Sequence, residues 1–223
     1  MKTQSITVVA AITTAAALSS GCMSMMIAGA PTTQSFDPPP VRETVDSFPR
    51  ESLIGKWTST GKEDMFMDGK RILVSDVRID MDLNEDGTCT HTETKTITEN
   101  RVGAQYGRGS QEAQIASEGT WSYQDGILSM DLHTEVSRGL IKRTVQFQLV
   151  ETVKWHSDEE FSLYSNEEQF AANSRSMGSG LGWDSRTVEP NGVETYVKKG
   201  GLMMPDQKAI VFLLPFKRVG DAE

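Results

Sequence analysis

The chain has 223 residues, of which 37% are hydrophobic, so it is long enough for one domain with its own core. Its formal net charge of -9 would repel phosphate backbones, and no basic cluster interleaved with aromatic residues offsets that charge, which argues against a nucleic-acid partner. The only cysteines, Cys22 and Cys89, lie far apart in unlike contexts, so no disulfide framework is predicted.

Residues 1–22 have the layout of a bacterial signal peptide. Met1 and Lys2 form a short positive region, residues 6–18 are apolar, and Ser-Ser-Gly then leads to Cys22. This ending resembles the lipobox of bacterial lipoproteins, in which the signal is cut before a cysteine whose thiol carries a diacylglycerol. The resemblance implies a signal peptide over 1–21, lipid attachment at Cys22 and membrane anchoring in the cell envelope. Met23, in place of an aspartate, is similar to the pattern of lipoproteins sorted to the outer membrane, facing the periplasm.

Two other interpretations of this segment stay open. Ala28-Gly29-Ala30 resembles an ordinary cleavage site that would release a soluble protein, although Pro31 follows it. The lack of charge from Thr3 to Phe36 would also allow an uncleaved anchor, although the Ser, Thr and Gly content is high for a membrane span. The Pro-rich, aperiodic residues 31–50 predict that 22–50 form an extended tether before a folded domain over 51–223.

Alternating apolar and polar residues predict short strands along the rest of the chain. They are expected over residues 53–60, 71–83, 88–98, 115–123, 127–136, 141–155, 161–165, 193–198 and 208–218. Residues 101–110 are interpreted as a loop or irregular strand end, and the Gly-rich stretch within 166–192 as a long loop insertion. Pro215 places the last strand at an edge or a bulge.

The stretch around Asp86-Gly87 allows two interpretations. Five residues fit a calcium-binding loop with the spacing D-x-[DN]-x-[DN]-G-x5-E, namely Asp82, Asn84, Asp86, Gly87 and Glu93. However, both flanks alternate with a period of two, and threonines at every second position from 88 to 98 are typical of a strand. A hairpin with Asp-Gly in its turn is therefore favoured, and the calcium site is the alternative.

Eight or nine short strands with almost no helical periodicity predict an all-β fold. The favoured architecture is an antiparallel up-and-down barrel of about eight strands, because closure removes exposed sheet edges. Three stretches resemble the lipocalin-like domains of bacterial lipoproteins, which are calycin-type barrels: residues 54–57, 83–88 and 119–128. Lys217-Arg218 is similar to the late basic residue that lipocalins stack on a first-strand tryptophan. The resemblance implies a barrel-closing cation–π pair between Arg218 and Trp57.

Motifs for catalysis or metal binding are weak. His91, His133 and His156 lie on different predicted strands without metal-ligand spacing, and neither a nucleophile elbow nor a nucleotide-binding loop occurs. The acidic runs at 158–160 and 167–168 are typical of solvated turns. No catalytic residue, cofactor or metal is predicted, and a hydrolytic enzyme has only unassigned acids and histidines in its support.

A tethered barrel favours a binding module that holds a small apolar or amphipathic ligand in its interior. The alternative is an envelope structural or assembly protein whose barrel is filled by its own side chains and which acts through its surface. The state of the interior separates the two hypotheses. Sequence leaves that state open, because it does not determine which face of each strand points inward.

Overall fold

A computed structural model describes residues 33–37, 39–100, 111–138, 141–165, 169, 183–201 and 205–220. Within these residues the chain forms one 3-10 helix and eleven strands. Their bounds are η1 Arg50–Leu53, β1 Gly55–Met67, β2 Lys70–Leu83, β3 Thr88–Asn100, β4 Gln111–Gln124, β5 Ile127–Arg138, β6 Ile141–Ser157, β7 Glu160–Tyr164, β8 Ser185–Val188, β9 Glu194–Lys198, β10 Gln207–Leu213 and β11 Phe216–Arg218.

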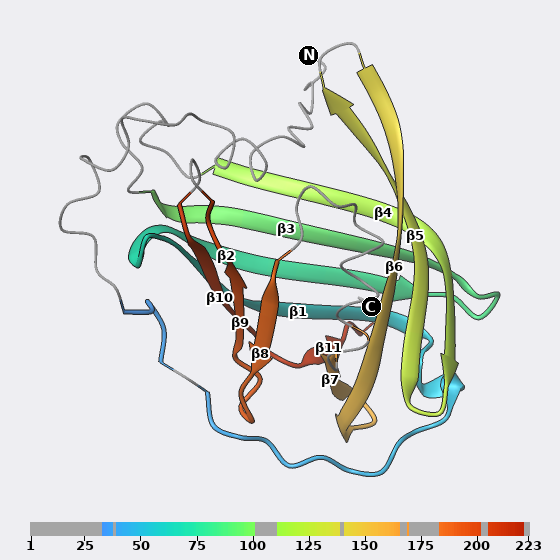
Figure 1. Ribbon diagram of the computed structural model, residues 1–223. Helices are drawn as coiled ribbons and strands as arrows, with labels where there is room; N and C mark the ends of the chain where they lie inside the picture. The colour runs from blue at the N-terminus through green and yellow to red at the C-terminus, as the bar shows by residue number, and fades with distance from the viewer. Residues whose placement is uncertain are drawn as a thin grey trace.

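Eight of the strands form a closed antiparallel ring. Strands β1 to β7 are hydrogen-bonded in chain order, β11 pairs with β7, and β11 also pairs with β1. Figure 1 shows this ring with β1 to β4 on one side and β5 to β7 on the other. The prediction of an all-β fold with an antiparallel barrel of about eight strands is confirmed.

The single strand predicted over residues 208–218 is wrong, because the chain divides there into β10 and β11. The division falls at Leu214-Pro215, and proline cannot donate to a strand ladder. Strand β1 pairs with both strands: Trp57 and Thr58 pair with β11, whereas residues 61–67 pair with β10. Gly61 lies at the change of partner, where a Cβ would be 1.9 Å from the carbonyl oxygen of Phe212. Only glycine allows the two backbones to approach so closely.

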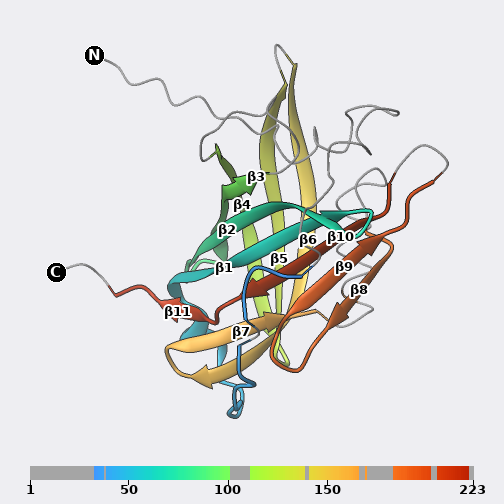
Figure 2. The same cartoon turned by 90° about the vertical axis from the view of Figure 1, so that its left-hand side faces the viewer.

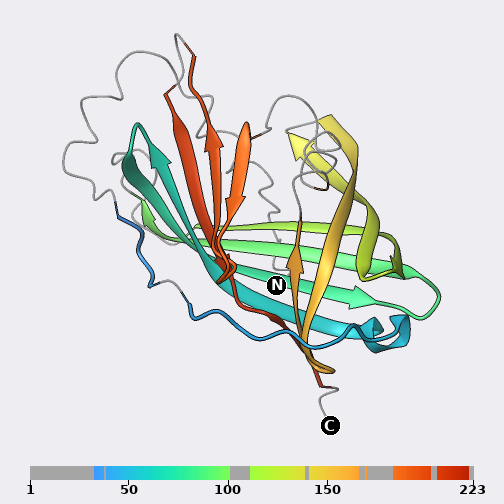
Figure 3. The same ribbon diagram turned by 60° about the horizontal axis from the view of Figure 1, so that its bottom comes forward.

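Three strands extend the sheet beyond the ring, in the order β10, β9, β8. Figure 2 shows them side by side as a separate arm. Strand β8 lies inside the stretch predicted as a long loop over 166–192, so that prediction is wrong for Ser185–Val188. On the other side of the ring, the pairing between β4 and β5 covers only Glu118–Gln124 and Ile127–His133. Beyond this paired segment, β4 and β5 diverge (Figure 3).

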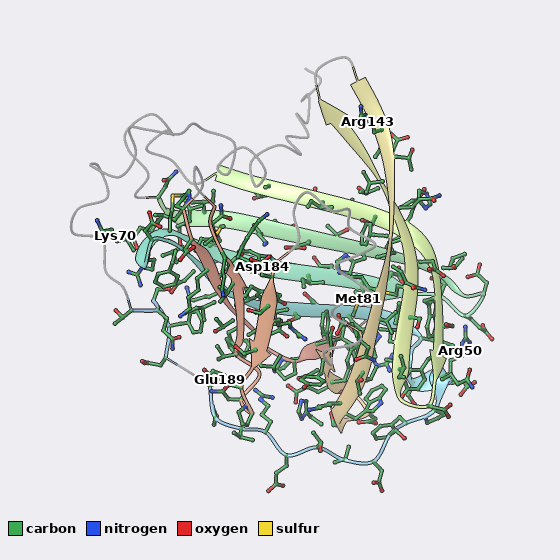
Figure 4. All side chains as sticks on the ribbon, in the orientation of Figure 1. Arg50, Lys70, Met81, Arg143, Asp184 and Glu189 are labelled. Carbon is green, nitrogen blue, oxygen red and sulfur yellow. The ribbon has the colours of Figure 1, made fainter. Side chains whose placement is uncertain are left out.

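We call the two ends of the barrel the closed end and the open end. The closed end carries η1 and the tight turns that join β2 to β3 and β4 to β5. The open end carries the β1–β2 turn and the far tips of β5 and β6. In Figure 4, Arg50 marks the closed end, whereas Lys70 and Arg143 lie at separate tips of the open end.

The β2–β3 connection is the predicted hairpin. Gly87 has φ of 84° and donates its N–H to the carbonyl oxygen of Asn84 at 3.0 Å. The Asp86 carboxylate accepts hydrogen bonds from the backbone N–H and hydroxyl of Thr88. Glu93 continues β3 and pairs with Lys95, 3.1 Å away, so it lies beyond reach of the turn. The calcium-loop alternative does not fit this geometry.

The closed end is filled by a hydrophobic core to which every strand of the ring contributes. Its buried members are Leu53, Trp57, Met81, Leu83, Cys89, Trp121, Leu128, Met130, Leu132, Val153, Trp155, Phe161 and Phe216. Phe161 lies 4.7 Å from Trp57 and 5.2 Å from Trp155, measured between ring centroids, in edge-to-face contacts. Such contacts contribute about 0.5–1.5 kcal/mol each beyond area burial. These residues identify the inward face of each strand.

Residues 33–37 and 39–49 are extended and lie along the outside of the barrel, passing beneath it in Figure 1. Val45 donates its N–H to the carbonyl oxygen of Trp155 at 2.9 Å, and Phe48 packs edge-on against the Trp155 ring. Arg42 forms an ion pair with Glu160. This part of the predicted tether therefore contacts the barrel. Among the described residues, no helix is long and apolar enough to cross a membrane.

Candidate functional site

Beyond the aromatic core, the inward faces of the strands change from apolar to charged. Because side chains alternate along a strand, Glu63 shares the inward face of β1 with Trp57. By the same alternation His91, Glu93 and Lys95 share the inward face of β3 with Cys89. The interior is thus divided into a filled closed end and a polar open end.

One charged group, which we call the lysine cluster, consists of Glu63, Glu93 and Lys95. Lys95 Nζ lies 2.7 Å from Glu63 Oε2 and 3.1 Å from Glu93 Oε1. Burial opposes the charge on Lys95, but the two carboxylates raise its pKa above the usual range. Burial likewise opposes the charge on Glu93, whereas Lys95 lowers the pKa of that carboxyl. The side chains of Glu93 and Lys95 nevertheless keep 30% and 20% of their surface exposed, so water reaches this part of the interior.

Two polar side chains lie beside the lysine cluster on neighbouring strands. His91 and Ser117 are directly opposite each other in the β3–β4 pairing. Ser117 is only 5% exposed, and its hydroxyl has no hydrogen-bond partner within the part of the chain that the structure describes. Burial lowers the pKa of His91, although the nearby Glu93 carboxylate opposes this shift. The imidazole is therefore neutral at pH 7.

A second charged group, which we call the arginine cluster, joins the arm to the ring. It consists of Glu151 on β6, Ser165, Arg186 on β8, and Glu194 and Tyr196 on β9. Arg186 Nε donates to Glu194 Oε2 at 3.0 Å, and Arg186 also donates to the carbonyl oxygen of Ser165. The hydroxyl of Tyr196 donates to Glu194, and the hydroxyl of Ser165 donates to Glu151. These bonds connect the outer edge of the arm to β6 and the end of β7.

The arginine cluster contains a carboxyl group with a strongly shifted pKa. Burial raises the pKa of Glu151 to about 7; the Ser165 hydrogen bond opposes this shift, and the Glu194 carboxylate adds to it. Burial, followed by the Glu194 charge, raises the pKa of Tyr196 well above its usual value. Glu194 raises the pKa of Arg186 against the effect of burial. Glu151 therefore changes its charge near neutral pH.

The two clusters belong to one continuous surface. Glu63, Val211 and Glu194 are cross-strand partners on β1, β10 and β9, so their side chains point to the same side of the sheet. Glu63 and Glu194 are two strands apart, which corresponds to about 10 Å between their backbones. The arm thus extends the sheet by three strands beside β1 at the open end, and the inward face of β1 continues onto it.

The structure brings together only some of the residues singled out by sequence. The Arg218 guanidinium carbon lies 4.4 Å from the centroid of the Trp57 ring, as the lipocalin resemblance implies. The histidines are dispersed: His91 faces the interior, His133 pairs with Glu118 on the outside, and His156 contacts Ser162 near the closed end. In the described ranges no group of three acidic, histidine or cysteine side chains is arranged to hold a metal ion. Cys22 lies outside the described residues.

The outside of the barrel carries a different feature, an open groove of about 770 Å3 over β1 to β4 and β10. Phe36 and Phe212 both line it, 6.1 Å apart between ring centroids. Four of its charged side chains form two ion pairs, with Lys62 Nζ 2.9 Å from Asp76 and Arg78 Nε 2.8 Å from Asp80. Exposed pairs of this kind contribute little to stability.

Comparison with known protein families, curated protein sequences and solved structures found no match to this chain. The fold supports the coarser part of the sequence resemblance, because a closed eight-stranded antiparallel barrel is consistent with a calycin-like architecture. Sequence reasoning missed Glu63, Glu151, Arg186 and Glu194 as site residues. A charged residue at an inward strand position would have indicated each of them, but the sequence did not determine which face of each strand points inward.

Proposed function

We propose that this chain is a binding module whose ligand occupies the open end of a lipocalin-like barrel, and that it binds without catalysing a reaction. The supporting observation is the division of the interior. Core side chains fill the closed end, whereas charged and partly exposed groups line the open end, where the arm extends the sheet. A pocket with an apolar floor and a few convergent polar groups is typical of small-molecule sites.

An amphipathic ligand suits this division better than a purely apolar one. Phe147 and Leu149 on β6 are partly buried and pack against the core, so they offer an apolar surface beside Glu151. The polar part of the ligand would then face the lysine and arginine clusters. An apolar ligand beside these clusters would displace water from their charged side chains without replacing its hydrogen bonds, which is unfavourable.

A matched pair of tryptophan variants tests whether the interior is the binding site. Ala113 is half-buried on the inward side of β4, whereas the next residue, Gln114, is exposed on the outer face. We expect Ala113→Trp to abolish the fluorescence enhancement of the amphiphile N-phenyl-1-naphthylamine, and Gln114→Trp to preserve it. Equal enhancement with both variants would exclude the open end as the site.

The second candidate is an envelope structural or assembly protein that acts through its surface. It is favoured by the filled closed end and by the outer groove, whose lining differs from that of the interior. A loss of probe binding with Gln114→Trp alone would support this candidate, because Gln114 lines the groove.

We also propose that the chain is a bacterial lipoprotein, anchored through acylated Cys22 to the periplasmic face of the outer membrane. The supporting observation is the signal-like segment that ends in Ser-Ser-Gly-Cys. Cys22→Ala should release the domain from membranes after cell fractionation. A variant that still partitions with membranes and has the same processed mass would exclude this form of anchoring.

A further inference from the structure

The charges of the open end are unbalanced. The lysine cluster places two carboxylates around one ammonium group. The arginine cluster places the Glu194 carboxylate beside one guanidinium group, together with Glu151, whose pKa of about 7 leaves it partly ionised at pH 7. Side chains of the lysine cluster are 10–30% exposed, so these charges are only partly solvated. A surface of this composition attracts a positively charged ligand more strongly than a neutral or negative one.

The second observation is a group of hydrogen-bond acceptors on β3 and β4. Ser117 and His91 are cross-strand partners, whose Cβ atoms are about 4.5–5.5 Å apart in such pairs. Glu93 follows two residues after His91 on the same face, about 7 Å along the strand. The Ser117 hydroxyl is 95% buried and has no partner among the described residues, which is a costly state for a polar group.

These three side chains match the donors of a primary ammonium group. The Glu93 carboxylate, the unprotonated nitrogen of a neutral His91 ring and the Ser117 hydroxyl oxygen each accept a hydrogen bond, and a primary ammonium group donates three. Charge-assisted bonds of this kind are shorter and stronger than neutral ones. The three acceptors together lead from the water-accessible Glu93 to the buried Ser117.

We propose that the ligand of the open end is a small primary amine in its ammonium form, held by His91, Glu93 and Ser117. This inference rests on the proposed binding function and names the chemical class of its ligand. The apolar part of the amine faces the floor formed by the aromatic core. The excess of carboxylates in the lysine cluster provides the attraction, and the three acceptors select a nitrogen that carries hydrogens.

Calorimetry on the full chain with four six-carbon probes tests the proposal. They are hexylammonium, trimethylhexylammonium, 1-hexanol and hexanoate, which share an alkyl chain and differ in charge or in N–H donors. We expect hexylammonium to bind at least about tenfold more tightly than each of the others, because a single charge-assisted hydrogen bond corresponds to about that factor.

Two variants and a control locate the binding group. Ser117→Ala and Glu93→Gln should each weaken hexylammonium binding about tenfold and leave 1-hexanol binding unchanged. Ser117→Ala removes a hydroxyl that has no partner in the described structure, so the fold is expected to tolerate it. Glu118→Gln is the control, because Glu118 adjoins Ser117 but lies on the outer face with its side chain 74% exposed.

The outcomes separate the two levels of the proposal. Equal binding of hexylammonium and 1-hexanol would overturn the amine inference and leave the binding function standing. Preferred binding of hexylammonium that neither variant weakens would overturn the assignment to these three residues. Failure of all four probes to bind would overturn both the inference and the proposed function.

Discussion

Removing the guanidinium of Arg218 should destabilise the closed end of the barrel. Arg218 donates hydrogen bonds to the carbonyl oxygens of Ser52 at 2.6 Å and Ile54 at 2.8 Å, and it stacks on Trp57. Hydrogen bonds from a charged donor contribute about 1.5–3 kcal/mol each, and a cation–π contact contributes about 0.5–2 kcal/mol. The lower figures together give about 3.5 kcal/mol for the three contacts.

We expect Arg218→Met to lower the free energy of unfolding by about 2–4 kcal/mol, since contacts made by one side chain overlap and water replaces part of them. The measurement is urea unfolding of the full chain followed by tryptophan fluorescence, with linear extrapolation to water. Lys217→Met is the matched control, because Lys217 is exposed on the neighbouring position. If Arg218→Met cost no more than this control, the barrel-closing role would be refuted.

Three further predictions concern glycines and the buried carboxyl. Gly119→Ala should lower the free energy of unfolding by about 3 kcal/mol or more, because the added Cβ would lie 1.9 Å from the Asp131 carbonyl oxygen. Gly126→Ala should lower it by only about 1 kcal/mol, because its Cβ meets open space. Urea unfolding compares the two variants. Gly87→Val should cost about 1–3 kcal/mol, because valine is strained at φ of 84°; a midpoint shift in thermal unfolding no larger than that of Glu118→Gln would contradict it. Since the folded pKa of Glu151 is raised from 4.5 to about 7, the folded state binds the extra proton between these values, and stability should fall as pH rises through that window. Unfolding measured across this range should show no such fall in Glu151→Gln.

Local sequence pattern predicted most strands because the inward and outward faces of β2, β5 and β6 differ in polarity. The Asp-Gly turns were predictable for a separate reason, since Gly87 and Gly126 both have positive φ. Local pattern could not reveal the division at Leu214-Pro215. Residues 208–218 are largely apolar on both sides of the division, and the change of partner falls between Thr58 and Gly61 of β1, far away in the sequence.

The candidate site was less predictable than the fold. On β3, threonines alternate with His91, Glu93 and Lys95, so neither face is apolar and hydrophobicity does not select the inward one. Glu63 on β1 and Lys95 on β3 form an ion pair only because both strands flank β2 in the sheet. Arg186 lies on a strand of four residues, which is too short to show alternation. Long-range pairing, rather than local periodicity, assembles both clusters.

The charged interior of the open end is poorly explained as a contribution to stability. Replacing buried ion pairs by apolar residues of similar size is often neutral or stabilising, whereas removing one partner leaves a costly unpaired charge. A barrel under selection for stability alone would extend its aromatic core toward the open end. Instead, β1 carries Trp57 in the closed end and Glu63 in the open end, on the same face of one strand. The tightly packed closed end therefore holds the ring together and leaves the open end to charged groups, an arrangement that stability alone does not explain and that the proposed binding function would explain.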